Sequence, residues 1–356
     1  MKKLILIASF LTSIFAQGQE YTFISDSLSL LPMQELIKKE PPADFEPVYY
    51  EDGTQVAFKE VLPLIMERKL IPRMFVDENG EYKALVVKST LKNEDIRILY
   101  ENIPESLSKS GYSFGNPDSD TVIINIDGGP ENDLATYIFE YTFTILGGLD
   151  ESNYFLINMR ESQTLHPEET EKEEISWEQA QNYNIKTVKT LYELINYFKS
   201  EDKKVYVVGG SYGSLVGLQS LADYNNIADG YLLMCGRLDM TKEVSTAYSK
   251  GYDANFEEDA ITPIIGEKSD NVYTVNMRKI AAAMNRDIKY TELLKDVDLS
   301  NLIYFYSEID QSVGKLTEKE IAFLKSKNAE VVSVKIEHGK YFKLLLKDGL
   351  EMMLND

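Results

Sequence analysis

The chain has 356 residues, with 58 acidic and 37 basic side chains and a formal net charge of −21. A surface this acidic repels nucleic acid phosphates and anionic lipid head groups, so we expect neither nucleic acid nor a membrane surface as a partner. Its single cysteine cannot form an internal disulfide.

The first 18 residues have the layout of a secretory signal peptide. Met1-Lys2-Lys3 is a basic start, Leu4 to Phe15 is a short apolar run, and residues 16–18 are mostly small. The apolar run is too short to span a bilayer. We therefore expect cleavage after Ala16 or Gly18, no membrane anchor, and an exported protein that is periplasmic or extracellular.

Residues 19–110 are predicted to form a small α+β extension with a stabilising role, ahead of a main domain at residues 111–356. Apolar positions from Phe58 to Lys69 keep helical spacing. Met74 to Val76, a turn, and Tyr82 to Val87 then read as a hairpin.

Strand-like and helix-like segments alternate in the main domain, as a mostly parallel, doubly wound α/β sheet requires. Ser176 and Gln179 form a capping box at the start of a long helix, one face of which is apolar. The expected segments are strands at 121–126 and 155–158, a helix near Leu134 to Thr144, and the apolar helix positions Ile185, Val188, Leu191, Ile195 and Phe198.

Residues 205–222 have the order strand, sharp turn, serine, sharp turn, helix. Val205 to Val208 is β-rich, Gly209-Gly210-Ser211-Tyr212-Gly213-Ser214 follows, and Leu215 to Ala222 has helical spacing. A G-x-S-x-G match arises by chance about 0.1 times in such a chain. Its place between a strand and a helix is that of a nucleophile elbow, in which the glycines avoid collisions with neighbouring backbone. We predict that Ser211 is a nucleophile.

The strand-like Tyr231 to Cys235 is followed by an irregular segment, residues 239–298. Cys235 is predicted to be a small buried apolar residue. In α/β-hydrolases, whose nucleophile elbow residues 209–214 resemble, a lid is usually inserted at this place. Glu257 and Glu258 within it are candidates for binding a substrate ammonium group, although a charge run is usually a solvated face.

A serine nucleophile needs a base, and a carboxylate that orients the base. His338 comes after the serine, as in the order Ser, Asp or Glu, His of α/β-hydrolases, and is the predicted base. His166 lies in an acidic loop before the serine, where a solvated surface histidine is expected. The acid is predicted to be Asp310, just after the apolar run 302–306, with Glu308 in reserve.

The third requirement is an oxyanion hole of backbone N–H groups. Asp127-Gly128-Gly129-Pro130 follows the buried strand 121–126, where such a loop is expected. The predicted donors are the amides of Gly129 and Tyr212. A Gly-Gly-Pro loop is also a common turn, so this motif is informative only together with the elbow.

The elbow and this loop resemble those of the α/β-hydrolase superfamily, and within it the prolyl aminopeptidase-like branch. That branch has an elbow of the form GGSWGS and an oxyanion loop of the form HGGPG, which read GGSYGS at 209–214 and DGGPE at 127–131 here. The resemblance covers about residues 118–349 and is poor in the cap region. It implies an α/β-hydrolase fold with a small lid insertion.

Two departures from the branch bear on specificity. Asp127 stands where the branch usually has histidine, and Glu131 stands where it has glycine. The branch's D-x-R-G-x-G-x-S appears as NMRESQT at 158–164, which keeps Arg160 and loses both glycines. A peptidase specificity therefore does not follow from the resemblance.

Together these residues predict a secreted serine hydrolase that cleaves an ester or a peptide or amide bond through an acyl-enzyme. Peptides with a free N-terminus would make it an aminopeptidase, and small acyl esters would make it a carboxylesterase. A non-catalytic binding module on the same fold is the remaining alternative. We expect a small-molecule or peptide substrate and no metal or organic cofactor, and the oligomeric state is left open.

Overall fold

A computed structural model of the chain divides into two compact units. The smaller contains the chain up to Asp95 together with Ala135–Ile145, and the larger contains Ile96–Leu134 and Leu146–Asp356. The domain boundary expected at residue 110 stays a prediction. The predicted signal peptide and Cys235 lie outside the described residues, which are 29–30, 46–50, 52–66, 70–77, 79, 81–89, 91, 95–134, 136–234, 236–285 and 287–355.

The smaller unit has a five-stranded sheet with the order β1-β4-β5-β2-β3 and the helix α3 (Phe58–Met66). The expected helix is present as α3. The expected hairpin is also present, because β4 and β5 pair in antiparallel fashion. Val61 and Ile65 of α3 share a buried apolar cluster with Leu85 and Val87 of the sheet. The strands are β1 (Ser29–Leu30), β2 (Val48–Tyr50), β3 (Gln55–Val56), β4 (Leu70–Val76) and β5 (Tyr82–Ser89), and the unit also holds α5 (Thr136–Tyr141), which a π-helical turn (Thr142–Leu146) follows.

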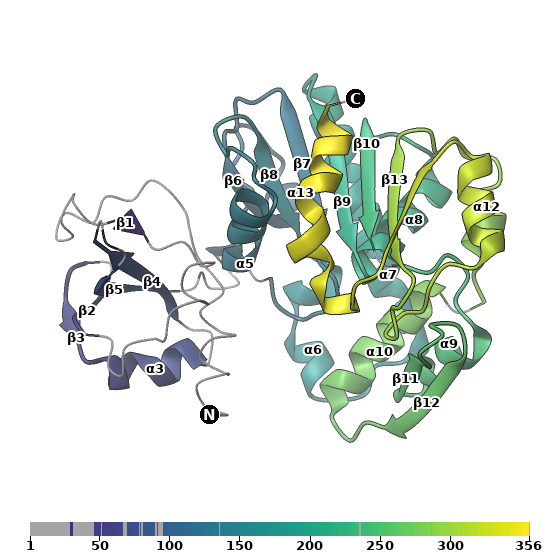
Figure 1. The fold of residues 1–356 in the computed structure, drawn as a ribbon, viewed down its shortest axis with the longest axis horizontal. Coiled ribbons are helices and arrows are strands. Elements are labelled where there is room, and N and C mark those ends of the chain that lie inside the picture. The colour runs from purple at the N-terminus through teal and green to yellow at the C-terminus, as the bar shows by residue number, and fades with distance from the viewer. Residues whose placement is uncertain are drawn as a thin grey trace. The chain divides into compact units, whose positions relative to one another are not determined.

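The larger unit is built on a seven-stranded sheet in which all neighbouring strands are parallel except β6 with β8 (Figure 1). Its central strands are almost continuously apolar and fully buried, as strands covered on both faces must be. The mostly parallel, doubly wound sheet expected from the sequence is confirmed. In order across the sheet the strands are β14 (Glu330–Val334), β13 (Leu302–Ser307), β10 (Gly230–Met234), β9 (Lys204–Gly210), β7 (Thr121–Ile126), β8 (Phe155–Met159) and β6 (Gly111–Gly115).

Helices cover both faces of this sheet. Leu232 and Leu233 are neighbours in β10 and therefore point to opposite faces. Gly349 of α13 lies against Leu232, and Gly217 of α8 lies against Leu233, so the two helices pack on opposite faces. Figure 1 shows α13, in yellow, crossing the near face. The longer helices around the sheet are α7 (Trp177–Ser200), α8 (Tyr212–Tyr224), α12 (Glu318–Ser326) and α13 (Tyr341–Leu354).

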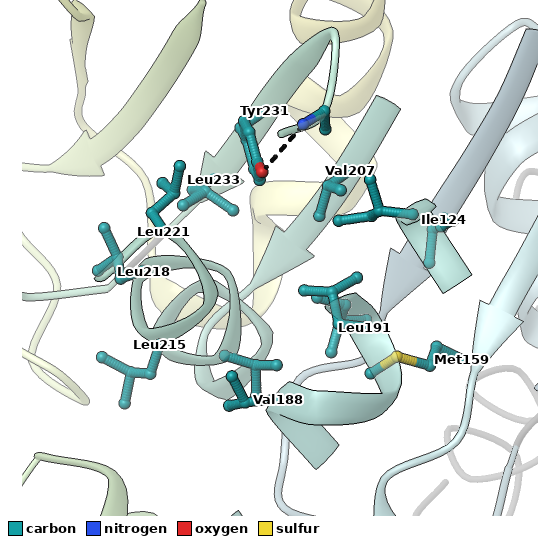
Figure 2. Close-up of a cluster of buried hydrophobic side chains, with 14 of the residues drawn as sticks. Ile124, Met159, Val188, Leu191, Val207, Leu215, Leu218, Leu221, Tyr231 and Leu233 are labelled. Atoms are coloured by element: carbon teal, nitrogen blue, oxygen red, sulfur yellow. Dashed lines mark hydrogen bonds between the residues drawn. The ribbon is translucent and has the colours of Figure 1, made fainter. Parts of the chain in front are cut away.

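The core beneath α7 and α8 is a cluster of buried hydrophobic side chains (Figure 2). Burying each such side chain contributes roughly 1.5–3 kcal/mol. The predicted capping box starts α7, since Ser176 accepts from the Gln179 amide and the Gln179 side chain accepts from the Ser176 amide. Members of the cluster are Val188 and Leu191 of α7, Leu215, Leu218 and Leu221 of α8, and Ile124, Met159, Val207, Tyr231 and Leu233 of the sheet.

One residue assigned to the apolar face of α7 is not buried. Ile185 is 63% exposed, whereas the polar Asn184 beside it is buried. Asn184 donates to the Ile280 carbonyl at 2.9 Å and accepts from the Tyr212 hydroxyl at 2.5 Å. Because these tertiary hydrogen bonds compensate the burial of an amide, the helix faces the core with Asn184 rather than Ile185.

The expectation of an irregular segment at 239–298 is also wrong. The segment forms three helices and an antiparallel hairpin, and its longest helix is held through Asn276, which donates to the Thr170 and Glu173 carbonyls and accepts from the Ile175 amide. These contacts join residues about a hundred positions apart, so no local pattern announces them. The elements are α9 (Lys242–Ser249), β11 (Tyr252–Phe256), β12 (Pro263–Lys268), α10 (Val272–Asn285) and α11 (Tyr290–Leu293).

Several one-turn helices complete the larger unit. No helix in the described part of the chain is both long and apolar enough to cross a bilayer. The short elements are α4 (Glu105–Ser108), α6 (Glu168–Glu171), and the 3₁₀ turns Ser162–Leu165 and His338–Lys340.

Candidate active site

The loops that follow β7, β8, β9, β10, β13 and β14 leave the sheet at one edge. The parallel strands all end there, and α/β sheets bind their ligands outside these carboxyl ends. Side chains that lie far apart in the sequence therefore meet at this edge. The candidate site forms where the loops after β7, β9, β13 and β14 converge.

Ser211 occupies a strained turn between β9 and α8. Its φ of 53° and ψ of −116° lie in a region that residues with a side chain rarely adopt. A Cβ on Gly213 would lie 2.2 Å from the Ile126 carbonyl oxygen, and one on Gly209 would lie 2.6 Å from the Gly213 carbonyl oxygen. The glycines are therefore required by close backbone approaches, as the sequence predicts for an elbow.

A chain of two hydrogen bonds joins Ser211, His338 and Asp310. The Nε2 atom of His338 lies 3.0 Å from the Ser211 Oγ, across 127 positions of sequence. The Nδ1 atom of the same ring lies 2.7 Å from the Asp310 Oδ2. The structure thus brings together the three residues that the sequence selects, in an order suited to proton transfer from the serine.

Asp310 is fully buried and accepts hydrogen bonds at both oxygens. Its Oδ1 accepts from the amides of Ser312 and Val313, at 2.9 and 3.1 Å. Its Oδ2 accepts from the Tyr341 hydroxyl at 3.2 Å, in addition to the histidine. Sequence reasoning missed Tyr341, although its spacing of three residues from His338 places it one helical turn away.

Glu308, the reserve candidate for the acid, lies elsewhere. Its side chain is 40% exposed and forms an ion pair with Lys335 at 3.4 Å. The histidine contact belongs to Asp310 instead.

The loop after β7 lies directly against Ser211. A Cβ on Gly128 would come within 3.4 Å of the Ser211 Cβ. Within the described residues, the backbone amides of Gly129 and Tyr212 donate no hydrogen bond to another protein group. Their assignment as oxyanion donors stays a prediction.

Asp127, at the start of this loop, sits in a network of side-chain amides. Asn125 donates to its Oδ1 at 2.7 Å, and Asn158 donates to its Oδ2 at 2.8 Å. Both bonds favour the charged carboxylate, but desolvation outweighs them and raises the pKa of Asp127 to about 6. A carboxyl with a raised pKa thus lies at the start of the loop after β7.

Glu161, after β8, is a buried carboxyl near the same loop. Only 3% of its surface is exposed. Burial raises its pKa well above the ordinary value, and the nearby charges of Asp127 and Glu131 raise it further. The only sequence signal for this residue is the departure at 158–164 from the glycine-containing motif of the resembling branch.

The remaining candidates lie on the surface. Glu257 and Glu258 are exposed at the turn between β11 and β12, and their role in binding an ammonium group stays a prediction. The Phe256 amide donates to the Gln311 carbonyl at 2.7 Å, which places this hairpin beside the loop of Asp310. The predicted surface position of His166 is confirmed, since its side chain is 64% exposed and lies 3.7 Å from Glu168.

No known protein-family profile and no curated protein matches the sequence. Solved structures are similar at low identity. An α/β-hydrolase enzyme, MGS-M2, from a Medee basin deep-sea metagenome library is 14% identical and covers 69% of this chain and 94% of its own, with a TM-score of 0.45. A lipase-esterase related protein from Clostridium acetobutylicum is 14% identical over 69% of this chain and 98% of its own, with a TM-score of 0.43. Est1E from Butyrivibrio proteoclasticus is 14% identical and covers 69% of this chain and 93% of its own, with a TM-score of 0.41.

The activities of these proteins are not transferred to this chain at such similarity. The parallel sheet, with the elbow at the end of β9 and helices on both faces, has the α/β-hydrolase fold.

Proposed function

We propose that the protein is a serine hydrolase that works by acyl transfer. The observation that carries this proposal is the hydrogen-bond chain from the Ser211 Oγ to His338 at 3.0 Å and onward to Asp310 at 2.7 Å. A non-catalytic binding module would have no need for this arrangement on a strained serine. We further propose that residues 1–18 direct export.

In the first half of the reaction, the Ser211 Oγ attacks the substrate carbonyl carbon while its proton passes to the His338 Nε2. The Nδ1 proton stays on the ring and is held by Asp310, whose negative charge stabilises the imidazolium. The tetrahedral intermediate then collapses, the leaving group takes the proton from Nε2, and an ester joins the acyl group to Ser211. In the second half, water attacks the ester while its proton passes to the His338 Nε2. Ser211 then takes that proton back, and the carboxylic acid is released.

The negative charge on the substrate oxygen needs donors that are already in place. The amides of Gly129 and Tyr212 are the proposed donors, one from each loop that flanks the nucleophile. Each such donor typically contributes 10²–10³-fold to the rate. Tyr212 is well fixed for this purpose, because its side chain is buried and its hydroxyl donates to Asn184 on α7.

The scissile bond is an ester or an amide. Aminopeptidase activity would need a carboxylate shielded from water to bind the substrate ammonium. Glu257 and Glu258 are exposed, where ion pairs contribute about 0–1 kcal/mol. Small acyl esters are therefore the first proposed substrates, and peptides with a free N-terminus are the second.

Hydrolysis of p-nitrophenyl acyl esters and aminoacyl p-nitroanilides tests the proposal. We expect wild-type protein to turn over at least one series, and Ser211→Ala and His338→Ala each to lower kcat by 10³-fold or more. His166→Ala is the matched control and keeps wild-type kcat. Equal turnover by wild type and Ser211→Ala would contradict the proposal, and the series that is cleaved decides between ester and amide.

A further inference from the structure

Two glutamate side chains converge on the oxyanion loop. Glu131 ends the loop, and Glu161 follows β8. A Cβ on Gly129 would lie 3.1 Å from the Glu131 Cγ and 3.3 Å from the Glu161 Oε1. Both side chains therefore approach the residue whose amide is a proposed oxyanion donor.

The backbone of Glu131 is held at its N–H and at its C=O by two buried side chains. The Glu131 amide donates to the Glu161 Oε2 at 3.3 Å. The Gln163 Nε2 donates to the Glu131 carbonyl at 2.8 Å and also to the Glu161 Oε2. Gln163 is fully buried and Glu161 is 3% exposed, so water does not compete for these bonds.

The segment that carries these two side chains is anchored on the long helix α7. The Ser162 amide donates to the Thr187 Oγ1 at 2.9 Å, and the Ser162 hydroxyl donates to the Tyr183 carbonyl at 3.0 Å. The Thr164 hydroxyl donates to the Glu161 carbonyl at 2.8 Å and closes the turn. The loop is thus tied to a rigid element through Glu161.

We propose that Glu161 and Gln163 are positioning residues, which fix the oxyanion loop through the backbone of Glu131, and that Glu161 acts as a neutral carboxylic acid. This inference rests on the proposed function, because it names the residues that hold one of the proposed oxyanion donors in place. Neither residue needs to touch the substrate.

The charges around Glu161 explain why the neutral form is the competent one. Asp127 and Glu131 are both acidic neighbours, and the buried Tyr212 hydroxyl is a third titratable group near it. The Tyr273 hydroxyl of α10 donates to the Glu131 carboxylate at 2.7 Å and not to Glu161. A negative charge on Glu161 would repel the oxyanion that forms nearby, whereas the acid still accepts both N–H bonds at Oε2.

Kinetics as a function of pH separate this role from a merely structural one. Glu161→Gln keeps a neutral group with an acceptor oxygen, so we expect kcat within about threefold of wild type and a weaker loss of rate at alkaline pH. Glu161→Ala and Gln163→Ala remove the two holding contacts, and we expect kcat to fall by 10–100-fold with KM changed much less. Glu168→Gln, on an exposed helix, is the control and keeps the wild-type profile.

Hydrogen exchange of the loop gives a readout that does not depend on activity. We expect the amides of Gly128, Gly129 and Glu131 to exchange faster in folded Glu161→Ala or Gln163→Ala than in wild type. Unchanged exchange overturns the inference whether or not the protein is an enzyme. The inference is also overturned if the kcat of Glu161→Gln is as low as that of Glu161→Ala. It is overturned as well if Glu161→Gln loses as much rate at alkaline pH as wild type does. Ser211→Ala that retains full activity would instead overturn the proposed function.

Discussion

Asp310 accepts four hydrogen bonds although it lies in a loop. Two come from backbone amides of its own turn, one from Tyr341 and one from His338. This arrangement fixes the carboxylate, and the carboxylate in turn fixes the tautomer of the histidine ring, with the proton on Nδ1 and the lone pair of Nε2 facing Ser211.

Asp310→Asn should therefore lower kcat by about 10⁴-fold, because an amide donor facing Nδ1 favours the wrong tautomer. The measurement is kcat on the best substrate, with folding checked by circular dichroism. Glu308→Gln is the matched control two residues away, since Glu308 pairs with Lys335 at the surface. An equal loss in both variants would remove Asp310 from its assigned role.

The junction of β9 and α8 depends on a residue with no side chain. A methyl group on Gly213 would collide with the Ile126 carbonyl oxygen at 2.2 Å, where backbone and not a flexible side chain must move. We expect Gly213→Ala to lower the free energy of unfolding by about 3–5 kcal/mol. Gly339→Ala has open space around its Cβ and is the control, with a change below about 0.5 kcal/mol. Urea denaturation measures both, and similar stability of the two variants would contradict the steric argument.

Helix α7 supports the site as well as the core. Its residues hold the Tyr212 hydroxyl through Asn184 and the Ser162 amide through Thr187. The capping box at Ser176 stabilises the start of this helix, about two to three helical turns before those contacts.

Ser176→Ala should lower the free energy of unfolding by about 1 kcal/mol and leave kcat unchanged, since the cap is local. Ser176→Asp restores a capping acceptor and should recover most of the loss. Urea denaturation followed by the fluorescence of Trp177, the single tryptophan, reports this directly. If Ser176→Asp is no more stable than Ser176→Ala, the lost stability does not come from the cap.

The elements that sequence could predict are those whose cause is local. The elbow is visible because Gly209, Ser211 and Gly213 are spaced by the turn itself. The helices and the hairpin at 239–298 could not be predicted, because α10 is held by Asn276 through partners about a hundred residues away. The exposure of Ile185 could not be predicted for a related reason. Its polar neighbour Asn184 is buried instead, because the distant Ile280 carbonyl and Tyr212 hydroxyl satisfy its amide.

The candidate site divides in the same way. Ser211, His338 and Asp310 follow from chain order and strand ends, which a sequence displays. The contacts of Tyr341 with Asp310, and of Glu161 and Gln163 with Glu131, depend on how loops from different strands pack. Apart from the spacing of three residues between His338 and Tyr341, no spacing in the sequence indicates these contacts.

On the scale of the whole molecule, two carboxyls with raised pKa values couple stability to pH. Glu161 and Asp127 have folded-state pKa values above their ordinary values, so between those values the folded state binds more protons than the unfolded state. Stability therefore falls as pH rises, for Asp127 between about 4 and 6 and for Glu161 up to its higher folded pKa.

Glu161→Gln removes one of these groups and should flatten the fall of the free energy of unfolding as the pH rises above the ordinary pKa of a glutamate. Urea denaturation at a series of pH values measures this. Glu168→Gln controls for the loss of one exposed negative charge from the strongly acidic chain. Parallel curves for wild type and Glu161→Gln would mean that Glu161 is already ionised in the folded protein.

The central claim is that Ser211 is activated by His338. Treatment of the purified protein with a fluorophosphonate probe, followed by peptide mass spectrometry, tests this most directly. The account predicts one covalent adduct on Ser211 in wild type and its loss in both Ser211→Ala and His338→Ala. A folded wild-type protein that stays unlabelled, or an adduct that persists in His338→Ala at the wild-type rate, would contradict it.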